Sequence, residues 1–480
     1  MLTRFGAGYA SVLRNATLLV SSHVLSALLR GAYVIIVARA LGPEAYGEFN
    51  YGLAWYLVFI ALTYLGLDVF LAQQVGRSPR LAGEALYQTF LLRSTAAIAA
   101  AITSIVCAWY VVSDPNLRRL MAIFSIGLIG RALWLWAVSA FTAFERSRYA
   151  LAGDAVFRPL EIVCALAVLA WRPDIQWLAV VHAALWWLQG LVGLRAVHGR
   201  LAAIRGSATL RGSLGLLAKT YPAGIYTIVT SLFMQAPIVL MQRTTSDSVY
   251  AGQFVLAYQA CVYLLVLPFV AASTILPVAA RSAQRQDGKD ALLTGLILRL
   301  VFVLGTLLVV LGGALLPALV EALFGSRYAE AGPLLQRAIW LLVLFTAVNV
   351  LSQLFFARES YAPVGWLGLL GAAVMCMFFV PAVERWAGTG GIAAVGGGLV
   401  IWYVALLVAT SGILPRFDRR GTFRAFLCSG LAAAVFALAA GQGNAAQLGV
   451  TVGTLLLACL VLRVFRRDDL STLSGILQAR

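Results

Sequence analysis

The chain has 480 residues, of which 61% are hydrophobic and 11% are charged, and its mean hydropathy is +0.89. Soluble domains are close to half apolar and a quarter charged, so this composition excludes a water-soluble globular protein. The net charge of +17 would suggest nucleic-acid binding in a soluble chain. In a membrane protein, the bias of basic residues toward cytoplasmic loops explains it better, and we expect no nucleic-acid partner.

Apolar runs long enough to span a membrane follow one another along the whole chain. A spanning helix needs roughly 20 such residues, because a bilayer core about 30 Å thick is crossed at about 1.5 Å per residue. We predict about fourteen spanning helices, at 16–38, 51–72, 90–112, 121–144, 155–171, 177–194, 221–241, 255–280, 300–320, 338–356, 366–383, 392–414, 425–440 and 448–462. The linkers are short apart from the basic connection at 195–219, so no soluble domain is expected. The first run contains Arg30 and lacks a convincing cleavage site, which favours a retained helix over a signal peptide.

Cysteine and histidine show no metal-ligand spacing. The six cysteines all fall inside apolar runs without a C-x-x-C pair, which is typical of small core residues. The three histidines are His23, His182 and His198, and they are not spaced as ligands. We predict no metal site, no cofactor and no disulfide.

The loop charges predict the orientation. With the N-terminus in the cytoplasm, about three quarters of the loop Lys and Arg residues fall on the cytoplasmic side. Arg158, near the start of the fifth segment, is counted with these cytoplasmic loop charges. The opposite side holds Arg39, Arg118, Arg119, Arg172, Arg243, Arg327, Arg337 and Arg385. We therefore expect a multi-pass protein of the bacterial inner membrane with both termini in the cytoplasm.

Faint internal symmetry indicates two related halves. Gly47-Glu48-Phe49 opens the second segment, and Gly252-Gln253-Phe254 opens the eighth. Because each half would have six helices, both would start on the same side of the membrane, related by a pseudo-twofold axis along the membrane normal. We predict an all-α fold with a six-helix lobe at 1–205, a second at 206–415, and two additional helices with a cytoplasmic tail at 416–480. Such lobes can rock about a central cleft for alternating access.

Two motifs resemble a known family. The run Ala38-Arg39-Ala40-Leu41-Gly42-Pro43-Glu44-Ala45-Tyr46-Gly47-Glu48-Phe49 resembles the A-R-x-L-G-P-x-x-Y-G-x-F signature of polysaccharide and O-antigen flippases. These belong to the multidrug/oligosaccharidyl-lipid/polysaccharide (MOP) exporter superfamily. Leu323-Phe324-Gly325-Ser326-Arg327-Tyr328-Ala329-Glu330-Ala331 is similar to the segment before their tenth helix.

The resemblance covers essentially the whole chain and implies a function. It implies flipping of an undecaprenyl-pyrophosphate-linked glycan from the cytoplasmic to the periplasmic leaflet, in a MATE-like fold. The lipid-linked glycan and membrane lipid would be the partners, with the polymerase and glycosyltransferases of the same pathway nearby. The residues alone indicate only a two-lobed, transporter-like protein.

Two short motifs also have plain structural interpretations. Gly42-Pro43 would end a helix and start a turn, because Pro cannot continue a helix and Gly relaxes the backbone. The glycine-rich run at 388–398 lacks the Lys-Ser/Thr ending of a phosphate loop. We expect it to allow close packing of helices.

Ionisable groups inside apolar runs are the candidates for substrate binding, because each costs at least roughly 2.5–3.5 kcal/mol at mid-bilayer unless it is paired or hydrated. They are Arg30, Asp68, Arg93, Arg131, Glu161, His182 and Arg299. Guanidinium offers bidentate contacts to phosphate, so we assign Arg30 and Arg131 to the pyrophosphate. Each could instead pair with a buried acid such as Asp68 purely to hold helices together. Arg93, Glu161 and Arg299 lie nearer the cytoplasmic boundary, where snorkelling is common, and could guide a head group.

The remaining candidates are an ion-coupling pair and a polar set. Asp68 could titrate as a coupling site or act as a counter-ion to Arg30, and His182 could relay protons or be a hydrogen-bonded core residue. The polar residues that could contact the glycan are Gln235, Tyr258, Gln259 and Asn349.

Three other classes of protein fit less well. A multidrug exporter of the same superfamily should have an acid-rich cleft, whereas these intramembrane charges are mostly arginine. An integral-membrane glycan polymerase or ligase should need a large loop or clustered acid, base or metal ligands. A purely structural scaffold would carry buried arginines that are energetically unfavourable and serve no function. We expect no enzymatic activity.

Overall fold

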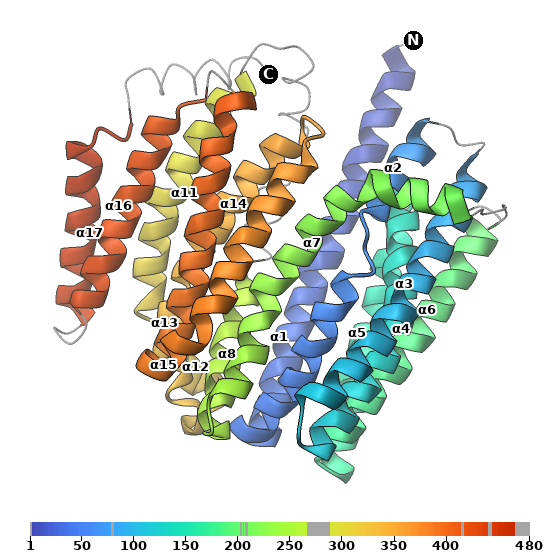
Figure 1. Ribbon diagram of the computed structural model, residues 1–480, viewed down its shortest axis with the longest axis horizontal. Coiled ribbons are helices and arrows are strands. Elements are labelled where there is room, and N and C mark those ends of the chain that lie inside the picture. Colours follow the sequence, from blue (N-terminus) through green and yellow to red (C-terminus); the bar gives the residue numbers. More distant parts are fainter. Residues whose placement is uncertain are drawn as a thin grey trace. The chain divides into compact units, whose positions relative to one another are not determined.

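The structure is a computed structural model, and every regular element among its described residues is helical (Figure 1). It describes residues 2–77, 81–201, 204, 206, 210–265, 289–413, 417–439 and 444–465, with the backbone alone for 2–27, 77, 210–211, 289–290 and 444–445. The chain divides into two compact units, Met1–Val255 and Leu256–Arg480, which we call unit 1 and unit 2.

The helices of unit 1 begin with a long kinked element. They are α1 (Leu2–Ala61), α2 (Leu67–Arg77), α3 (Ala82–Val111), α4 (Pro115–Ala143), α5 (Arg148–Trp171), α6 (Ile175–Arg200), α7 (Leu210–Thr244) and the start of α8 (Ser248–Leu264). Unit 2 holds the end of α8, then α11 (Lys289–Gly313), α12 (Leu316–Phe324), η2 (Ser326–Tyr328), α13 (Ala331–Ala338), α14 (Trp340–Phe356), α15 (Tyr361–Ile413), α16 (Arg419–Leu438) and α17 (Asn444–Val461).

The predicted spanning segments fall on these helices. Among the described residues, eight helices are long and apolar enough to cross a membrane, and α15 alone carries two of the predicted segments. The first segment and the start of the second are joined in α1, whereas a turn at 62–66 interrupts the second segment before α2 begins. Residues 266–280 of the eighth lie outside the described residues. The prediction of a polytopic all-α membrane protein is confirmed.

Several predicted boundaries are wrong. The basic connection predicted at 195–219 is mostly helical, because α6 continues to Arg200 and α7 already begins at Leu210. Helix α5 begins at Arg148 instead of near residue 155, so Arg158 is inside a helix and not in a loop. Polar residues at helix ends hid these extensions, since apolar runs mark only the part of a helix that needs to be apolar.

Glycine sets the backbone at both family motifs. Gly42 has φ 77° and ψ 173°, and the two helices that make up α1 meet at this kink. In the second motif, Gly325 has φ 89° and ψ 170° and separates α12 from η2. This backbone region is essentially restricted to glycine. The predicted break at Gly42-Pro43 is confirmed.

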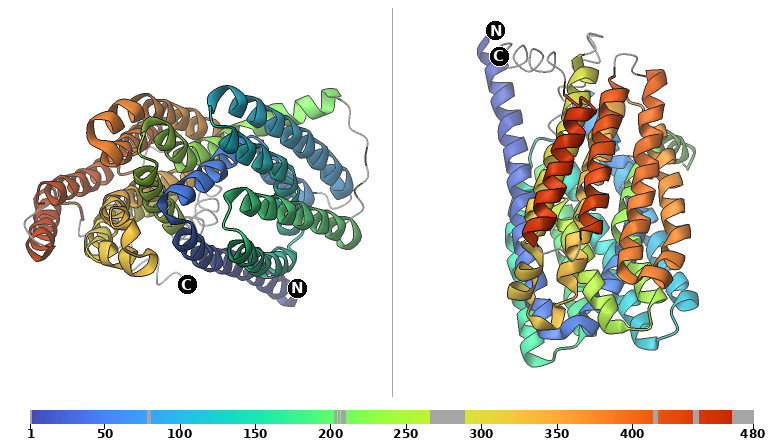
Figure 2. Two further views of the ribbon diagram at one scale, coloured as in Figure 1. Left: turned by 90° about the horizontal axis from the view of Figure 1, so that it is seen from below. Right: turned by 90° about the vertical axis from the view of Figure 1, so that its left-hand side faces the viewer.

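Unit 1 is held together by closely packed helices that run side by side (Figure 2). Helices α4 and α6 approach closely at Gly130 and Gly190: a Cβ on Gly190 would lie 2.4 Å from the Gly130 carbonyl oxygen. Polar side chains add bonds between helices, since Trp55 Nε1 donates to Ser104 Oγ at 3.0 Å and Ser104 lies 2.7 Å from Ser125. Small residues and interhelical hydrogen bonds are the usual means of association in membranes, where lipid is as apolar as leucine.

In unit 2, α15 folds back on itself. The backbone leaves helical geometry at Trp386 and Ala387, where Ala387 has φ 50°. A Cβ on Gly390 would then lie 1.9 Å from the carbonyl oxygen of Ala382, and one on Gly391 would contact the Phe379 ring. The glycine-rich run therefore packs two helical segments together, as the sequence predicts.

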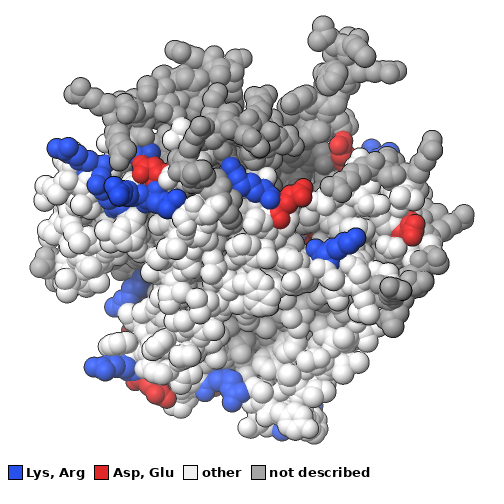
Figure 3. Space-filling view, turned by 45° about the horizontal axis from the view of Figure 1, so that its top comes forward, with Lys and Arg blue, Asp and Glu red and all other residues white. Residues whose placement is uncertain are grey.

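The surface matches a lipid environment. Trp109, Leu308 and Leu460 are 67%, 71% and 76% exposed, which would be costly in water for so many large apolar side chains. In the view of Figure 3, most of the described surface carries no charged residue.

Candidate functional site

Three arginines from three helices gather inside unit 1. Arg30 lies on α1, Arg131 on α4 and Arg158 on α5. The charges of Arg30, Arg158 and Asp154 are close enough to act on Arg131, and all three arginines act on Tyr56. Arg131 Nη1 donates to Gln189 Oε1 on α6 at 3.2 Å. Arg30 and Arg131 are half-buried and Arg158 is buried. We call these three residues the arginine cluster.

Glu161 connects this cluster to His182. Arg158 Nη1 donates to Glu161 Oε2 at 2.7 Å, and His182 Nδ1 lies 2.5 Å from Glu161 Oε1. The other imidazole nitrogen, Nε2, is 2.6 Å from the Tyr33 hydroxyl. The spacing of three residues between Arg158 and Glu161 puts both on one face of α5. Glu161 and His182 are both buried, so this chain of contacts is largely shielded from the surroundings.

The charges of the cluster do not cancel. Three guanidinium groups face the carboxylates of Asp154 and Glu161 among the described residues, which leaves an excess of guanidinium over carboxylate groups. A concentration of guanidinium groups with surplus charge is suited to bind a phosphate-bearing group, because arginine forms paired hydrogen bonds with phosphate oxygens.

Aromatic rings surround the histidine. Tyr56 and Trp186 lie with ring centroids 4.6 Å apart, and His182 lies 5.5 Å from Trp186 and 5.6 Å from Phe49. Large aromatic side chains supply apolar contact area with little conformational freedom to lose, so they fix the position of the polar groups they enclose.

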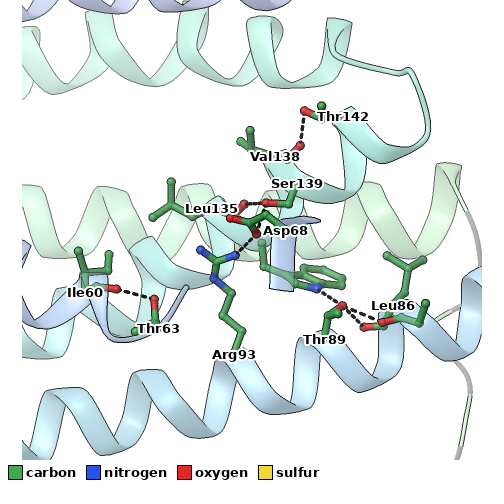
Figure 4. Close-up of polar contacts among 12 residues, drawn as sticks. Ile60, Thr63, Asp68, Leu86, Thr89, Arg93, Leu135, Val138, Ser139 and Thr142 are labelled. Carbon is green, nitrogen blue, oxygen red and sulfur yellow. Dashed lines mark hydrogen bonds and ion pairs between the residues drawn. The ribbon is translucent and has the colours of Figure 1, made fainter. Parts of the chain in front are cut away.

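Asp68 has a different partner from the one considered in the sequence. Its Oδ1 lies 2.5 Å from Arg93 Nη1 and accepts a hydrogen bond from Ser139 Oγ at 2.6 Å (Figure 4). Arg93 is 1% exposed and also lies over the Tyr64 ring, 4.5 Å from its centroid. Asp68 is therefore a counter-ion to Arg93, not to Arg30. These contacts join α2, α3 and α4, which favours a packing role for the pair.

The other candidates are distributed over both units. In unit 1, Gln235 lies buried on α7. In unit 2, Arg299 on α11 donates to the Val464 carbonyl oxygen at 3.0 Å and lies 3.8 Å from Asp418. Tyr258, Gln259 and Asn349 are buried, with Gln353 donating to Asn349 at 3.4 Å. Contact of any of these with a substrate stays a prediction.

Sequence reasoning missed two members of the site. Arg158 was assigned to a loop, and Asp154 was not singled out. The signal was present as acidic and basic residues at positions 154, 158 and 161, which lie on one face of a helix that starts before its apolar run. The side chains of His23 and Ser26, which share a helix face with Arg30 in the sequence, lie outside the described residues. No three Asp, Glu, His or Cys side chains gather as metal ligands in the described part of the chain.

Solved structures with a similar fold are membrane transporters and flippases. A multidrug resistance MATE transporter of the MOP superfamily, in an inward-facing conformation, has a TM-score of 0.64 at 14% identity over 83% of this chain and 98% of its own. The lipid II flippase MurJ, in an inward closed conformation, has a TM-score of 0.64 at 13% identity over 95% and 99% of the two chains. A MOP superfamily transporter from Pyrococcus furiosus has a TM-score of 0.61 at 14% identity over 88% and 96%.

The fold is thus that of these transporters and flippases, a multi-pass membrane protein. The chain belongs to the polysaccharide biosynthesis protein family, whose pattern matches residues 12–283. A search of curated protein sequences finds no significant match.

Proposed function

We propose that this protein is a flippase of the bacterial inner membrane. It moves an undecaprenyl-pyrophosphate-linked oligosaccharide or polysaccharide repeat unit from the cytoplasmic to the periplasmic leaflet by alternating access, and it catalyses no covalent step. Arg30 and Arg131, joined by Arg158, bind the pyrophosphate. The observation that carries the proposal is the arginine cluster with its surplus positive charge inside unit 1.

The energetic cost of the cluster supports a ligand of opposite charge. Each arginine costs roughly 2.5–3.5 kcal/mol at mid-bilayer on insertion scales, and the two carboxylates beside the cluster offset only part of it. A pyrophosphate supplies the missing negative charge while it is bound. An amphipathic cation, the cargo of a drug exporter, would be repelled by the same residues.

The family and the fold support the same class of cargo. Membership in the polysaccharide biosynthesis protein family favours a glycan substrate, and a similar fold occurs in a flippase for lipid II. A glycan carried on a membrane lipid needs a translocase that passes a large polar group through the bilayer, and a helical transporter fold suits that task.

His182 is the proposed site of ion coupling. Facing it are Tyr33 and Phe49 from α1, Phe124 from α4, Trp186 from α6 and the carboxylate of Glu161 from α5, with Arg158 bonded to the same carboxylate. Gain of a proton by His182 would strengthen its pairing with Glu161 and weaken the hold of Glu161 on Arg158, freeing Arg158 for the pyrophosphate. Asp68 is the alternative coupling site, although its pairing with Arg93 and Ser139 favours a structural role.

The proposal is tested by depleting the protein in its host and determining the leaflet in which the undecaprenyl-linked glycan accumulates. We expect accumulation on the cytoplasmic face, restored to normal by the wild-type protein but not by Arg30→Ala or Arg131→Ala at equal protein level. Arg172→Ala is the matched control, since this exposed residue ends α5 away from the cluster. Normal translocation of the glycan after depletion would refute the proposal.

The proposed ion-coupling role of His182 is tested separately, by the response of transport to a pH gradient. With His182→Gln, transport should lose its response to an imposed pH gradient while binding of the lipid-linked glycan is retained. An unchanged response would exclude His182 as the coupling residue and leave the flippase proposal intact.

A further inference from the structure

A cavity lies in unit 1, and none of the three arginines of the cluster lines it. It has a volume of about 710 Å³ and is lined by the ends of α4 and α6 and the beginning of α5. Its floor is apolar and includes Trp134, Phe141, Phe157 and Val192. The cavity is large enough for part of a hydrocarbon chain. Its apolar floor would contact such a chain without burying a polar group that lacks a hydrogen-bond partner.

Glycines on α5 and α6 shape this cavity. A Cβ on Gly153 would lie 2.1 Å from the Trp134 ring, and one on Gly193 would lie 2.9 Å from Ala137, so these positions let the tryptophan ring form the floor. Gly199 differs, because a Cβ built there meets nothing within 4 Å. Because Gly199 lines the cavity, a larger side chain there has room to begin, and we expect it to fill part of the cavity.

The rim of the cavity is basic. Arg195 and Arg200 line it, both exposed, and neither has a carboxylate partner in the described part of the chain. Arg200 lies over the Tyr149 ring, 5.6 Å from its centroid, and Arg148 lies over the same ring at 4.9 Å. Hydrogen bonds from these two guanidinium groups lower the pKa of the half-buried Tyr149 phenol below its ordinary value, which reflects a local excess of positive charge.

The cavity opens on a different face of α5 from the arginine cluster. Val156, which lines the cavity, is 61% exposed, and Val163 on the same helix is 60% exposed. Arg158 and Glu161 are buried. Exposed valines in a membrane helix face lipid, so the cavity is open to molecules that diffuse in the bilayer.

We propose that this cavity binds an anionic phospholipid, with its phosphate between Arg195 and Arg200 and an acyl chain along the floor beside Trp134. The combination of a basic rim and an apolar floor matches an amphipathic anion, whereas free phosphate would leave the floor unused. Basic pockets between membrane helices are suited to phospholipid head groups. The open, lipid-facing position favours a resident phospholipid over the transported molecule. This inference does not depend on the proposed flippase activity.

The experiment measures lipid binding to the full-length protein purified in detergent, by native mass spectrometry with added phosphatidylglycerol or phosphatidylcholine. We expect one phosphatidylglycerol to bind in preference to phosphatidylcholine. The double variant Arg195→Gln/Arg200→Gln should bind it about 30-fold more weakly, since each basic residue near a membrane surface contributes about 1 kcal/mol. Arg195→Lys/Arg200→Lys should keep most of the binding.

Two further variants keep the test independent of folding defects. Gly199→Trp leaves all the rim charges in place and should abolish the preferred lipid by filling the cavity. Arg172→Gln, at the opposite end of α5, should bind as the wild type does. Melting temperatures of all variants show that they are folded.

Three results would overturn the proposal. Unchanged phosphatidylglycerol binding in both the double variant and Gly199→Trp would exclude the cavity as the site. Full competition by inorganic phosphate would identify a phosphate site instead of a lipid site. Strong preference for undecaprenyl phosphate over phosphatidylglycerol would assign the cavity to the transported lipid.

Discussion

Arg93 and Arg131 have opposite surroundings, although both lie inside apolar helices. Arg93 is nearly fully buried, bonded to Asp68 and covered by the Tyr64 ring. Arg131 is half-buried and donates to a neutral amide, and two further arginines act on its charge together with a single carboxylate, that of Asp154. A guanidinium bonded to a carboxylate has its charge compensated by the protein. One bonded to an amide keeps a net charge that an anionic ligand can neutralise.

We expect the Asp68–Arg93 pair to stabilise the folded protein. Asp68→Asn should lower the free energy of unfolding by about 2 kcal/mol, because it leaves a buried guanidinium without its counter-ion. The double variant Asp68→Leu/Arg93→Met should recover most of the loss, since it removes both charges. Thermal unfolding in detergent measures both effects. If Asp68→Asn keeps its melting temperature but abolishes transport, the carboxylate is functional and the packing role is wrong.

At the scale of elements, the kink in α1 depends on Gly42. Its φ of 77° with ψ of 173° is a conformation that costs other residues of order 1–3 kcal/mol. Gly42→Ala and Gly325→Ala should each lower the melting temperature, and transport should fall only in proportion to folded protein. Gly31→Ala in the same helix is the control, because a Cβ there meets nothing within 4 Å. Equal melting temperatures for Gly42→Ala and Gly31→Ala would contradict this account.

The contact between α1 and α8 depends on Gly252. A Cβ at this position would lie 1.8 Å from the carbonyl oxygen of Pro43, a backbone atom that cannot move aside easily. Gly252→Ala should therefore destabilise the protein by about 1–3 kcal/mol through overpacking. Gly430→Ala in α16, where the space is open, should be neutral or stabilising, since alanine favours helix over glycine. Urea or thermal unfolding of the two variants distinguishes these outcomes, and equal stability would refute the contact.

Particular residues show how much the sequence could predict. Hydropathy alone predicts the helices, because the bilayer imposes one length and one polarity on every spanning segment. The Gly42-Pro43 break was predictable from local backbone chemistry. The partner of Asp68 was not predictable, because Arg30 and Arg93 both lie on neighbouring helices and only the packing of the helices selects Arg93. Arg158 was missed because it was counted with the charges of the loop before the fifth segment. The start of that helix had been placed where the apolar run begins, whereas α5 begins earlier, at Arg148.

At the scale of the whole molecule, the charge distribution predicts how the chain crosses the membrane. Asn116 lies in the first turn of α4 and Arg146 follows its end, so the two exposed positions lie on opposite sides if α4 spans the bilayer. In a cysteine-free background, Asn116→Cys should react with a membrane-impermeant maleimide from the periplasm, and Arg146→Cys only after permeabilisation. The reverse pattern would invert the predicted orientation, and labelling of both from one side would show that α4 does not cross.

The central claim is that the arginine cluster of unit 1 binds the pyrophosphate of a lipid-linked glycan during translocation. Its most direct test uses purified protein in liposomes that contain an undecaprenyl-pyrophosphate-linked glycan, with an impermeant glycan-modifying enzyme reporting which leaflet holds it. We expect protein-dependent translocation, reduced about 10- to 100-fold by Arg131→Ala because a charge-assisted hydrogen bond contributes about 1.5–3 kcal/mol. Arg131→Lys should restore it only in part, because lysine keeps the charge but not the paired hydrogen bonds. Wild-type rates in Arg30→Ala, Arg131→Ala and Arg158→Ala, each folded as judged by its melting temperature, would contradict the claim.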